Sequence, residues 1–372
     1  MIPFIDLATQ RERLQDKLDA MIRKIIAEGR YVLGPEVSEL EERLAAFGQV
    51  GHAVTCANGT DALSLPLMAW ELKPGDAVFV PSFTFASTVE VVPLLGATPV
   101  FVDIDPDTYC MCPKSLEKAI AWTKTKSDLE PRVVIAVDLF GQPADYPAIS
   151  AICEVEGLKL IADSAQGFGC TLNGEHPSAW ADIATISFYP AKPLGCYGDG
   201  GAVVTRESDL ASLIKSLRNH GEGETRYSYE RIGLNSRLDT LQAGILLAKL
   251  DIFSDEIIGR NRAAQGYAKG FGDIVKPPKV IDGGVSVWAQ YTIEVGDRDE
   301  FRAKLNAAGI PTAIYYPVPM HMQAPYADYP VVPGGLPVTE TAAPRVVSLP
   351  MDGYLDGERQ DAVIRAVRAA LG

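Results

Sequence analysis

Polar and apolar positions recur with a period close to 3.6 along residues 14–47, and this spacing predicts helix. Gly34 and Pro35 interrupt the pattern, because both residue types break helices, and the segment EVSELEERLAAF then resumes it. We therefore expect two amphipathic helices in this part of the chain, separated at Gly34-Pro35.

Seven short apolar runs follow, and helix-compatible stretches or turns rich in Gly, Pro and Asp separate most of them. They lie at residues 52–56, 77–80, 99–102, 133–137, 158–163, 183–188 and 201–205. The run VVIAV is apolar throughout and LKLIA is apolar except for Lys159, which is typical of strands covered on both faces. Strands that alternate with helices predict an α/β domain with a mostly parallel sheet.

After about residue 250 the pattern becomes a mixture of helices and isolated strands. Helical spacing runs to about residue 271, and Pro277 and Pro278 then interrupt the chain. The elements expected beyond them are a strand at 286–295, a helix at 297–309, a strand at 312–315 and a helix at 356–371. This pattern predicts a second, smaller α+β domain. The expected division is a large domain of residues 12–250 and a small domain of residues 251–372 together with 1–11.

The composition is that of an ordinary globular protein with an acidic surface. The chain has 372 residues, which corresponds to two or three domains at about 150 residues each. Hydrophobic residues make up 47% and charged residues 22%, so a disordered chain is excluded. The net charge of −14, from 34 Lys+Arg and 48 Asp+Glu, repels nucleic-acid phosphates and anionic membranes. A local basic pocket for a small anionic substrate is still compatible with this charge.

The sequence predicts a cytoplasmic protein without a metal site. The N-terminal residues turn polar within eight positions, unlike a signal peptide, and no apolar run approaches the roughly 18 residues that span a bilayer. Of the six cysteines only Cys110 and Cys112 lie close together, and no second pair completes a zinc site. Four histidines leave little room for a His-rich metal site. We therefore expect buried, reduced thiols.

The densest run of unusual chemistry is DIATISFYPAKPLGCYGDGGAVVT, residues 182–205. A predicted strand leads into a Gly-rich loop in which Lys192 stands between Pro190 and Pro193, and neither phosphate-binding fingerprint, GxxxxGK[ST] nor GxGxxG, is present. The prolines prevent a helix through Lys192 and hold its backbone rigid. A lysine held at the end of a buried strand suits Schiff-base chemistry, because burial lowers its pKa. The alternative is a surface lysine in a loop.

A carboxylate lies upstream, where the apolar run LKLIA ends in Asp163 and SAQGFG follows. Open α/β sheets bind ligands at the carboxyl ends of their strands, which is where Asp163 falls. On its own Asp163 is equally compatible with a helix N-cap. Paired with a rigid lysine, it fits pyridoxal phosphate (PLP), for which a lysine forms the imine and an Asp partners the pyridinium nitrogen.

Two further motifs fit a flat, phosphorylated ligand. In the segment ANGTDA, Gly59 and Thr60 stand at a predicted helix start, where free N–H groups bind anions. A plain N-cap is the alternative there. In the segment PSFTFAS, Phe85 is a candidate to stack on a flat ring, and a core position is its alternative.

Together and in this order, these motifs resemble the DegT/DnrJ/EryC1/StrS family of sugar aminotransferases. The resemblance extends over nearly the whole chain, through FIDLATQ, YVLGPEVSELE, ANGTDAL, PSFTFAST, DLFGQPAD, IADSAQGFG, SFYPAKPLGCYGDGGAVVT, GLNSRLDTLQAGIL, YYPVPMHMQ and SLPM. It implies the aspartate-aminotransferase-like PLP fold type I. In that fold a large domain with a mixed, mostly parallel seven-stranded sheet carries a smaller C-terminal α+β domain. It also implies PLP as the cofactor, with pyridoxamine phosphate as its intermediate form.

The resemblance assigns roles around the cofactor ring. Lys192 matches the lysine that forms the Schiff base and then moves protons between the substrate and cofactor carbons. Asp163 matches the residue that keeps the pyridine nitrogen protonated, so that the ring acts as an electron sink. Gln166 matches a residue near the phenolic oxygen of the ring, and Phe85 occupies the stacking position.

The resemblance also implies a phosphate cradle and a second subunit. Gly59, Thr60 and Ser187 match the residues of the cradle. Asn235, in GLNSRL, matches an asparagine that reaches the phosphate from the neighbouring subunit. The implied protein is therefore a homodimer whose active sites are shared between its subunits.

Five residues are candidates for binding the substrate. Arg231 and Arg237 flank Asn235 and would neutralise a phosphate or a sugar carboxylate, and surface salt bridges are their alternative. Tyr315 and Tyr316 are candidates to stack on the nucleotide base or simply to pack. His321, in YYPVPMHMQ, matches a position near the sugar nucleotide, and capping of a loop carbonyl is its alternative.

The loop sequence SFYPAKPLGCYGDGG is similar to relatives that aminate C-3 of a 3-oxo sugar nucleotide. Relatives that act at C-4 more often show Thr-Gly-Glu-Gly-Gly after the lysine. The resemblance implies transfer of an amino group from L-glutamate to a nucleotide sugar, with UDP-2-acetamido-2-deoxy-3-oxo-glucuronate as the best match, in the route to O-antigen amino sugars. Two half-reactions through one site imply ping-pong kinetics.

Other functions remain open from the sequence. The enzymatic alternatives are a dTDP-3-oxo-6-deoxyhexose 3-aminotransferase, a 4-oxo-sugar aminotransferase and a PLP dehydratase. The dehydratases among the relatives carry His in place of the lysine, so Lys192 favours transamination. A regulatory or binding protein that keeps the fold is the alternative outside enzymology, and the presence of Lys192 and Asp163 argues against it.

Overall fold

The seven apolar runs form one sheet in the computed structural model, which describes residues 2–225 and 227–372. The strand order is β1-β8-β7-β5-β4-β2-β3, and β8 runs antiparallel to both of its neighbours while the other neighbouring pairs are parallel. The strands are β1 (His52–Cys56), β2 (Asp76–Pro81), β3 (Thr98–Val102), β4 (Glu130–Val137), β5 (Lys159–Asp163), β7 (Ile183–Ser187) and β8 (Gly201–Thr205). The predicted mixed, mostly parallel sheet is confirmed.

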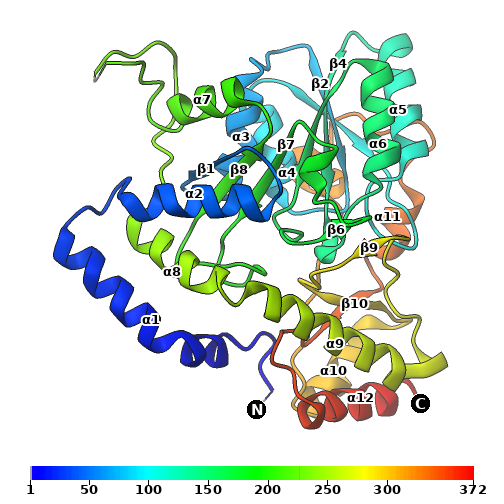
Figure 1. The fold of residues 1–372 in the computed structure, drawn as a ribbon. Coiled ribbons are helices and arrows are strands. Elements are labelled where there is room, and N and C mark those ends of the chain that lie inside the picture. Colours follow the sequence, from blue (N-terminus) through cyan, green and yellow to red (C-terminus); the bar gives the residue numbers. More distant parts are fainter. Residues whose placement is uncertain (1, 226) are drawn as a thin grey trace.

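Helices cover both faces of this sheet (Figure 1). On β1, Ala53 packs with the helix α2, whereas the next residue, Val54, packs with α3 and α7 on the opposite face. This alternation explains why the strands are predominantly apolar. The helices of this part of the chain are α2 (Pro35–Phe47), α3 (Gly59–Ala69), α4 (Ala86–Leu94), α5 (Pro113–Lys126), α6 (Tyr146–Glu156), α7 (Ser208–Leu217) and α8 (Thr240–Leu250).

The first helix differs from the expected one. α1 (Leu7–Glu28) begins before residue 14, because the Asp6 side chain accepts a hydrogen bond from the Thr9 amide and caps it. It ends at Gly29, which takes a left-handed conformation with φ of 70°, and not at Gly34. The expected second helix is present, and it begins at Pro35, one residue before its predicted start at Glu36.

A second buried cluster forms the smaller part of the molecule, below the sheet in Figure 1. Its main elements are α9 (Phe253–Phe271), β10 (Tyr291–Glu294), α10 (Arg298–Ala307), β11 (Val346–Leu349) and α12 (Gly357–Leu371). β10 and β11 pair antiparallel, so the predicted α+β character is confirmed. The remaining elements are β6 (Thr171–Leu172), β9 (Gly284–Val285) and α11 (Pro337–Ala342), with 3₁₀ turns at Leu139–Gly141, Pro177–Ala179, Gly272–Ile274, Met320–Met322 and Ala324–Tyr326.

Of two further expected strands, one is shorter than predicted and the other is absent. The segment 286–295 is a strand only over Tyr291–Glu294, because β10 pairs with the four-residue strand β11 and the preceding residues bond to the loop at Phe140 and Gly141 instead. The segment 312–315 is not a strand, and Ala313 makes a single bridge to Ser348. Prolines flank that segment in the sequence and lack the N–H groups that a longer ladder needs.

The division into residues 12–250 and 251–372 stays a prediction. Met320, Val332 and Leu336 belong to the buried cluster around the large sheet, although they lie beyond residue 250. The N-terminal residues do join the smaller part, since the Met351 amide donates to the Phe4 carbonyl at 3.1 Å. No helix in residues 2–225 or 227–372 is both long enough and apolar enough to cross a membrane.

Candidate active site

Lys192 lies in a closed loop between the neighbouring strands β7 and β8. The Cys196 amide donates to the Phe188 carbonyl and the Lys192 amide donates to the Tyr189 carbonyl, both at 2.8 Å. The Lys192 side chain is half-buried, and desolvation lowers the pKa of its ammonium group, while the carboxylate of Asp163 opposes this effect. A lowered pKa increases the share of the neutral amine, which is the nucleophilic form.

Asp163 ends β5, the strand beside β7, and is 4% exposed. Its Oδ2 accepts a hydrogen bond from the Thr88 hydroxyl at 2.8 Å, and its Oδ1 accepts one from the Ala165 amide at 3.2 Å. Burial raises the pKa of this carboxyl group, while the two donors and the nearby Lys192 act in the opposite direction. The predicted placement of a carboxylate and a lysine together at the carboxyl ends of strands is therefore what the structure has.

Gln166 and two aromatic residues surround this pair. The Gln166 Oε1 atom accepts from the Phe140 amide at 2.8 Å, and its Nε2 atom donates to the Tyr316 hydroxyl at 3.0 Å. The Tyr316 ring lies 6.1 Å from the ring of Phe85, measured between centroids. Phe85 is 54% exposed, so it is not the core residue that its alternative interpretation predicts. Its open face is of the kind that stacks on a flat ring.

Gly59, Thr60 and Ser187 meet where α3 begins. A Cβ atom on Gly59 would lie 2.7 Å from the Cβ of Ser187, so only glycine allows the helix to start this close to the end of β7. The Thr60 and Ser87 hydroxyls lie 2.7 Å apart. Within the described residues, the Gly59 and Thr60 amides have no hydrogen-bond partner, because no helical carbonyl lies four residues before them. These amides and hydroxyls suit an anion.

Two residues that contact this site were missed in the sequence analysis, Ser87 and Thr88. They follow Phe85 in the first turn of α4, and they join the two halves of the site, since Ser87 contacts Thr60 and Thr88 contacts Asp163. Their signal was present in the motif PSFTFAST, in which two hydroxyl residues follow the exposed aromatic after a single alanine.

The residues present fit PLP. The exposed aromatic face matches its ring, and the buried carboxylate matches its pyridine nitrogen. The half-buried lysine of lowered pKa matches its aldehyde, and the cluster of amides and hydroxyls matches its phosphate. Among the described residues there is no group of three or more His, Cys, Asp or Glu side chains that could hold a metal ion. Five of the six cysteines are buried and Cys112 is half-buried, so the expectation of buried thiols is confirmed for five of them.

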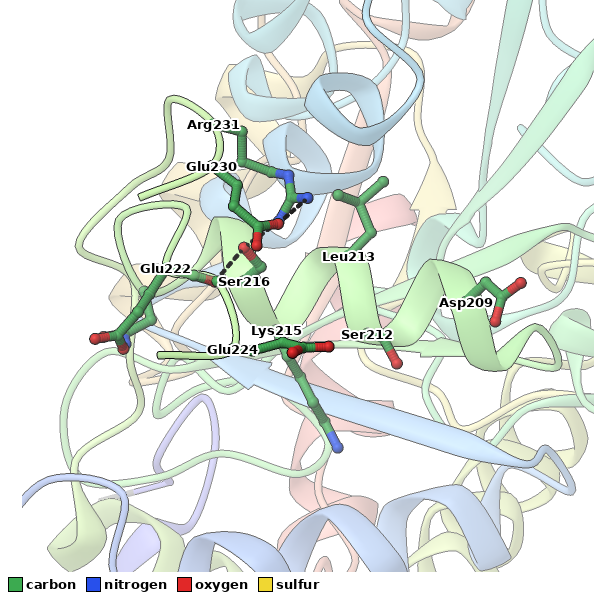
Figure 2. Close-up of a pocket in the computed structure, with 11 residues that line it drawn as sticks. Asp209, Ser212, Leu213, Lys215, Ser216, Glu222, Glu224, Glu230 and Arg231 are labelled. Atoms are coloured by element: carbon green, nitrogen blue, oxygen red, sulfur yellow. Dashed lines mark hydrogen bonds and ion pairs between the residues drawn. The ribbon is translucent and has the colours of Figure 1, made fainter. Parts of the chain in front are cut away.

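The two arginines make their hydrogen bonds with residues other than these. Arg231 lines a pocket of 620 Å³ between α7 and the segment that follows it (Figure 2). There it donates to Ser216 at 2.5 Å and pairs with Glu230 at 2.9 Å, as its salt-bridge alternative predicts. Arg237 donates to the side-chain oxygen of Asn219 at 3.1 Å. Their roles toward a substrate stay predictions.

The remaining candidates lie closer to the cofactor residues. Tyr316 bonds to Gln166, as described above, and Tyr315 packs with its ring 5.8 Å from that of Tyr316. His321 does not cap a loop carbonyl: its Nδ1 lies 2.7 Å from the Ser82 hydroxyl and its Nε2 lies 3.3 Å from Glu340. Asn235 is exposed, as a residue that reaches a neighbouring subunit must be.

Comparison with known proteins agrees with this geometry. Residues 12–368 match the model of the DegT/DnrJ/EryC1/StrS aminotransferase family. The chain is 46% identical to UDP-2-acetamido-2-deoxy-3-oxo-D-glucuronate aminotransferase of Pseudomonas aeruginosa, over 100% of this chain and 99% of that protein. A crystal structure of a DegT/DnrJ/EryC1/StrS aminotransferase from Brucella abortus covers 100% of both chains, with a TM-score of 0.99 and 52% identity.

A third comparison bears on the cofactor. The structure of NtdA from Bacillus subtilis with bound pyridoxamine phosphate has a TM-score of 0.88 and 28% identity, and the match covers 99% of this chain and 83% of that one. The chain therefore belongs to the DegT/DnrJ/EryC1/StrS aminotransferase family and is a PLP-dependent sugar aminotransferase.

Proposed function

We propose that the protein transfers an amino group from L-glutamate to the 3-oxo group of UDP-2-acetamido-2-deoxy-3-oxo-glucuronate. The reaction belongs to the cytoplasmic synthesis of amino sugars for O-antigen. The observation that carries the proposal is the placement of Lys192 and Asp163 at neighbouring strand ends beside the open face of Phe85. The full-length similarity to the Pseudomonas aeruginosa enzyme supports the choice of sugar.

Each residue near the lysine has a task in this proposal. PLP, when bound, supplies an electron sink for the carbon that gains or loses the amino group. Lys192 would hold the cofactor through its amine and, once its amine is free, would move a proton to and from the reacting carbon. Asp163 holds a proton on the pyridine nitrogen. Gln166 orients the phenolic side of the ring, and Phe85 stacks against the ring and excludes water from one face.

The phosphate of the cofactor is held from two subunits. Gly59 and Thr60 supply amides, and Thr60 and Ser187 supply hydroxyls. Asn235 of a second copy would complete the cradle, so we propose a homodimer with shared active sites. Exposed apolar side chains near Asn235 support this assembly, since Tyr229 is 59% and Ile232 is 91% exposed.

The first experiment is the visible absorption spectrum of the protein purified with PLP, before and after addition of L-glutamate. A yellow band that bleaches to the band of pyridoxamine phosphate is the expected result. The loaded protein should then convert the 3-oxo sugar nucleotide to a product whose mass has gained nitrogen. A band that ignores glutamate would point to another donor, and a product without added nitrogen would point to a dehydratase.

The Lys192→Ala variant is the control for the lysine. It should lack the band that PLP forms with the wild-type protein, and it should not turn over. A Lys192→Ala protein that still turned over would overturn the proposed role of this residue.

A further inference from the structure

A second lysine, Lys249 on α8, is 1% exposed and makes a contact that the proposed reaction does not use. Its Nζ atom donates a hydrogen bond to the carbonyl of Gly195 at 2.6 Å and lies 4.3 Å from the centre of the Tyr197 ring. Desolvation lowers the pKa of its ammonium group to about 8. Burying an ammonium group costs desolvation free energy, so a buried lysine needs a favourable contact that offsets this cost.

Both partners of Lys249 belong to the loop that carries Lys192. Gly195 is packed so tightly that a Cβ atom on it would lie 2.6 Å from the Pro190 carbonyl oxygen and 2.7 Å from that of Tyr189. The loop therefore folds back on itself, and the residues just before Lys192 touch those just after it. A group that fixes the Gly195 carbonyl fixes both arms of the loop.

The helix that carries Lys249 is itself held firmly. Its Ile245 and Ala248 side chains pack against Leu14 and Leu18 of α1. The same helix makes a second contact with the loop, because the Tyr197 amide donates to the Gln242 side-chain oxygen at 2.8 Å. α8 thus holds the lysine loop at two points, of which Lys249 is the buried one.

We propose that Lys249 is a positioning residue, which holds the loop so that the amine of Lys192 stays in place while it is not attached to the cofactor. This inference rests on the proposed role of Lys192. While Lys192 is attached, the covalent bond fixes its position. Once the amino donor has displaced Lys192, only the loop fixes the position of its amine. A misplacement of about 1 Å lowers the rate on the order of 100-fold.

The first test is hydrogen exchange of the loop amides in the pyridoxamine phosphate form, in which Lys192 is free. Lys249→Met keeps the length of the side chain and removes its donors, and Lys249→Arg restores donors and charge. The matched control is Ile245→Ala, which weakens the packing of α8 against α1 and leaves the contacts to the loop intact. Lys249→Met should speed exchange at the Lys192 and Cys196 amides about ten-fold, because a charge-assisted hydrogen bond is lost.

In Lys249→Arg we expect part of this protection to return, and in Ile245→Ala we expect exchange at these two amides to stay within about two-fold of wild type. Gln242→Ala removes the exposed contact and should have a smaller effect in the same loop. If Lys249→Met does not fold, Gln242→Ala and Lys249→Arg still test the proposal. Unchanged loop exchange in every folded variant would overturn it.

The second test is the primary kinetic isotope effect with α-deuterated L-glutamate in single turnovers. In Lys249→Met the proton transfer should slow about ten-fold or more and the isotope effect should rise toward its full value, with glutamate affinity little changed. Ile245→Ala should keep the wild-type isotope effect. Equal isotope effects in Lys249→Met and wild type would overturn the proposal. A wild-type protein that does not react with glutamate would instead reject the proposed donor, and the exchange test would still decide the role of Lys249.

Discussion

Among single residues, Asp163 is a carboxylate whose burial is unfavourable for its charge, and that charge suits the protonated pyridine nitrogen of PLP. Burial raises its pKa, and the Thr88 hydroxyl, the Ala165 amide and Lys192 together lower it. Asp163→Asn keeps the size of the side chain and removes its negative charge. We expect the variant to bind PLP and to react with L-glutamate about 10²–10³-fold more slowly, because the charge that holds the pyridine proton is lost. The decay of the visible band in single turnovers measures this rate.

Thr88→Val is the graded control for that experiment. It removes one hydrogen bond to Asp163 and keeps the charge. A single neutral donor contributes about 1 kcal/mol, so the rate should fall by about ten-fold or less. Asp163→Asn reacting as fast as wild type would contradict the assigned role of the carboxylate.

His176 gives a pH dependence that is independent of catalysis. It is 2% exposed, its Nε2 atom has no partner within the described residues, and burial lowers its pKa from 6.5 to about 4. Between pH 6.5 and pH 4, His176 is protonated in the unfolded chain and neutral in the folded chain. The free energy of unfolding therefore falls as the pH falls through this range. This one residue should cost wild type about 2 kcal/mol between pH 7 and pH 5.

His176→Asn isolates this contribution, because asparagine keeps an acceptor for Ser178 and does not titrate. Urea unfolding of both proteins at pH 7 and pH 5 should show the smaller loss in the variant. Parallel losses in the two proteins would mean that His176 is protonated in the folded state or is not buried from solvent.

Among the elements, the start of α3 depends on how closely it approaches the end of β7. A Cβ on Gly59 would lie 2.7 Å from the Cβ and 3.0 Å from the hydroxyl of Ser187, which is closer than real Cβ contacts come. Gly59→Ala must therefore push the first turn of the helix away from the strand. We expect PLP affinity to fall at least about ten-fold and stability to fall by about 1–3 kcal/mol. Cofactor titration and thermal unfolding measure the two effects.

Gly296→Ala is the matched control, because a Cβ there meets open space and its φ is not positive. It should leave PLP affinity unchanged and alter stability by less than about 1 kcal/mol. Equal PLP affinity in Gly59→Ala and wild type would show that the phosphate does not depend on this helix start.

The elements also show what the sequence can and cannot predict. All seven strands of the sheet were predictable, because burial on both faces makes them predominantly apolar. The segment 312–315 was mistaken for a strand, because its pattern carries no information about whether a partner lies beside it. Likewise, Arg231 is four residues from Asn235 in sequence, yet the structure pairs it with Ser216 and Glu230.

The site itself was predictable where each residue belongs to a local motif. Lys192, Asp163 and Phe85 stand in sequence patterns with an independent chemical meaning, and the structure has Asp163 at the end of β5, Lys192 in the loop after the neighbouring strand β7, and Phe85 exposed. Lys249 has no such pattern, because it lies in an apolar helix 54 residues from the carbonyl that it contacts. Only the packing of α8 against the loop reveals its role.

At the scale of the whole molecule, one segment carries exposed side chains that a single copy of the chain leaves uncovered. The chain between α7 and α8 leaves the body of the large domain (Figure 1) and carries exposed Tyr229, Ile232 and Asn235. Tyr31 and Val32 lie beside the end of this segment, through the bridge between Val32 and Asp239, and they are about half exposed. A second copy covering these side chains would bury them and bring its Asn235 to the phosphate cradle.

Shared active sites make a prediction that two independent sites would not. Lys192→Ala removes the lysine, and Asn235→Asp sets a negative charge against the phosphate, so each variant alone should be nearly inactive. If each site takes Lys192 from one subunit and Asn235 from the other, a mixed dimer has one site with both defects and one intact site. Unfolding and refolding an equal mixture should then restore about a quarter of wild-type activity, because half of the dimers are mixed and half of their sites are intact. No recovery of activity, with mixed dimers detected by differential tagging, would place both residues in the same subunit's site.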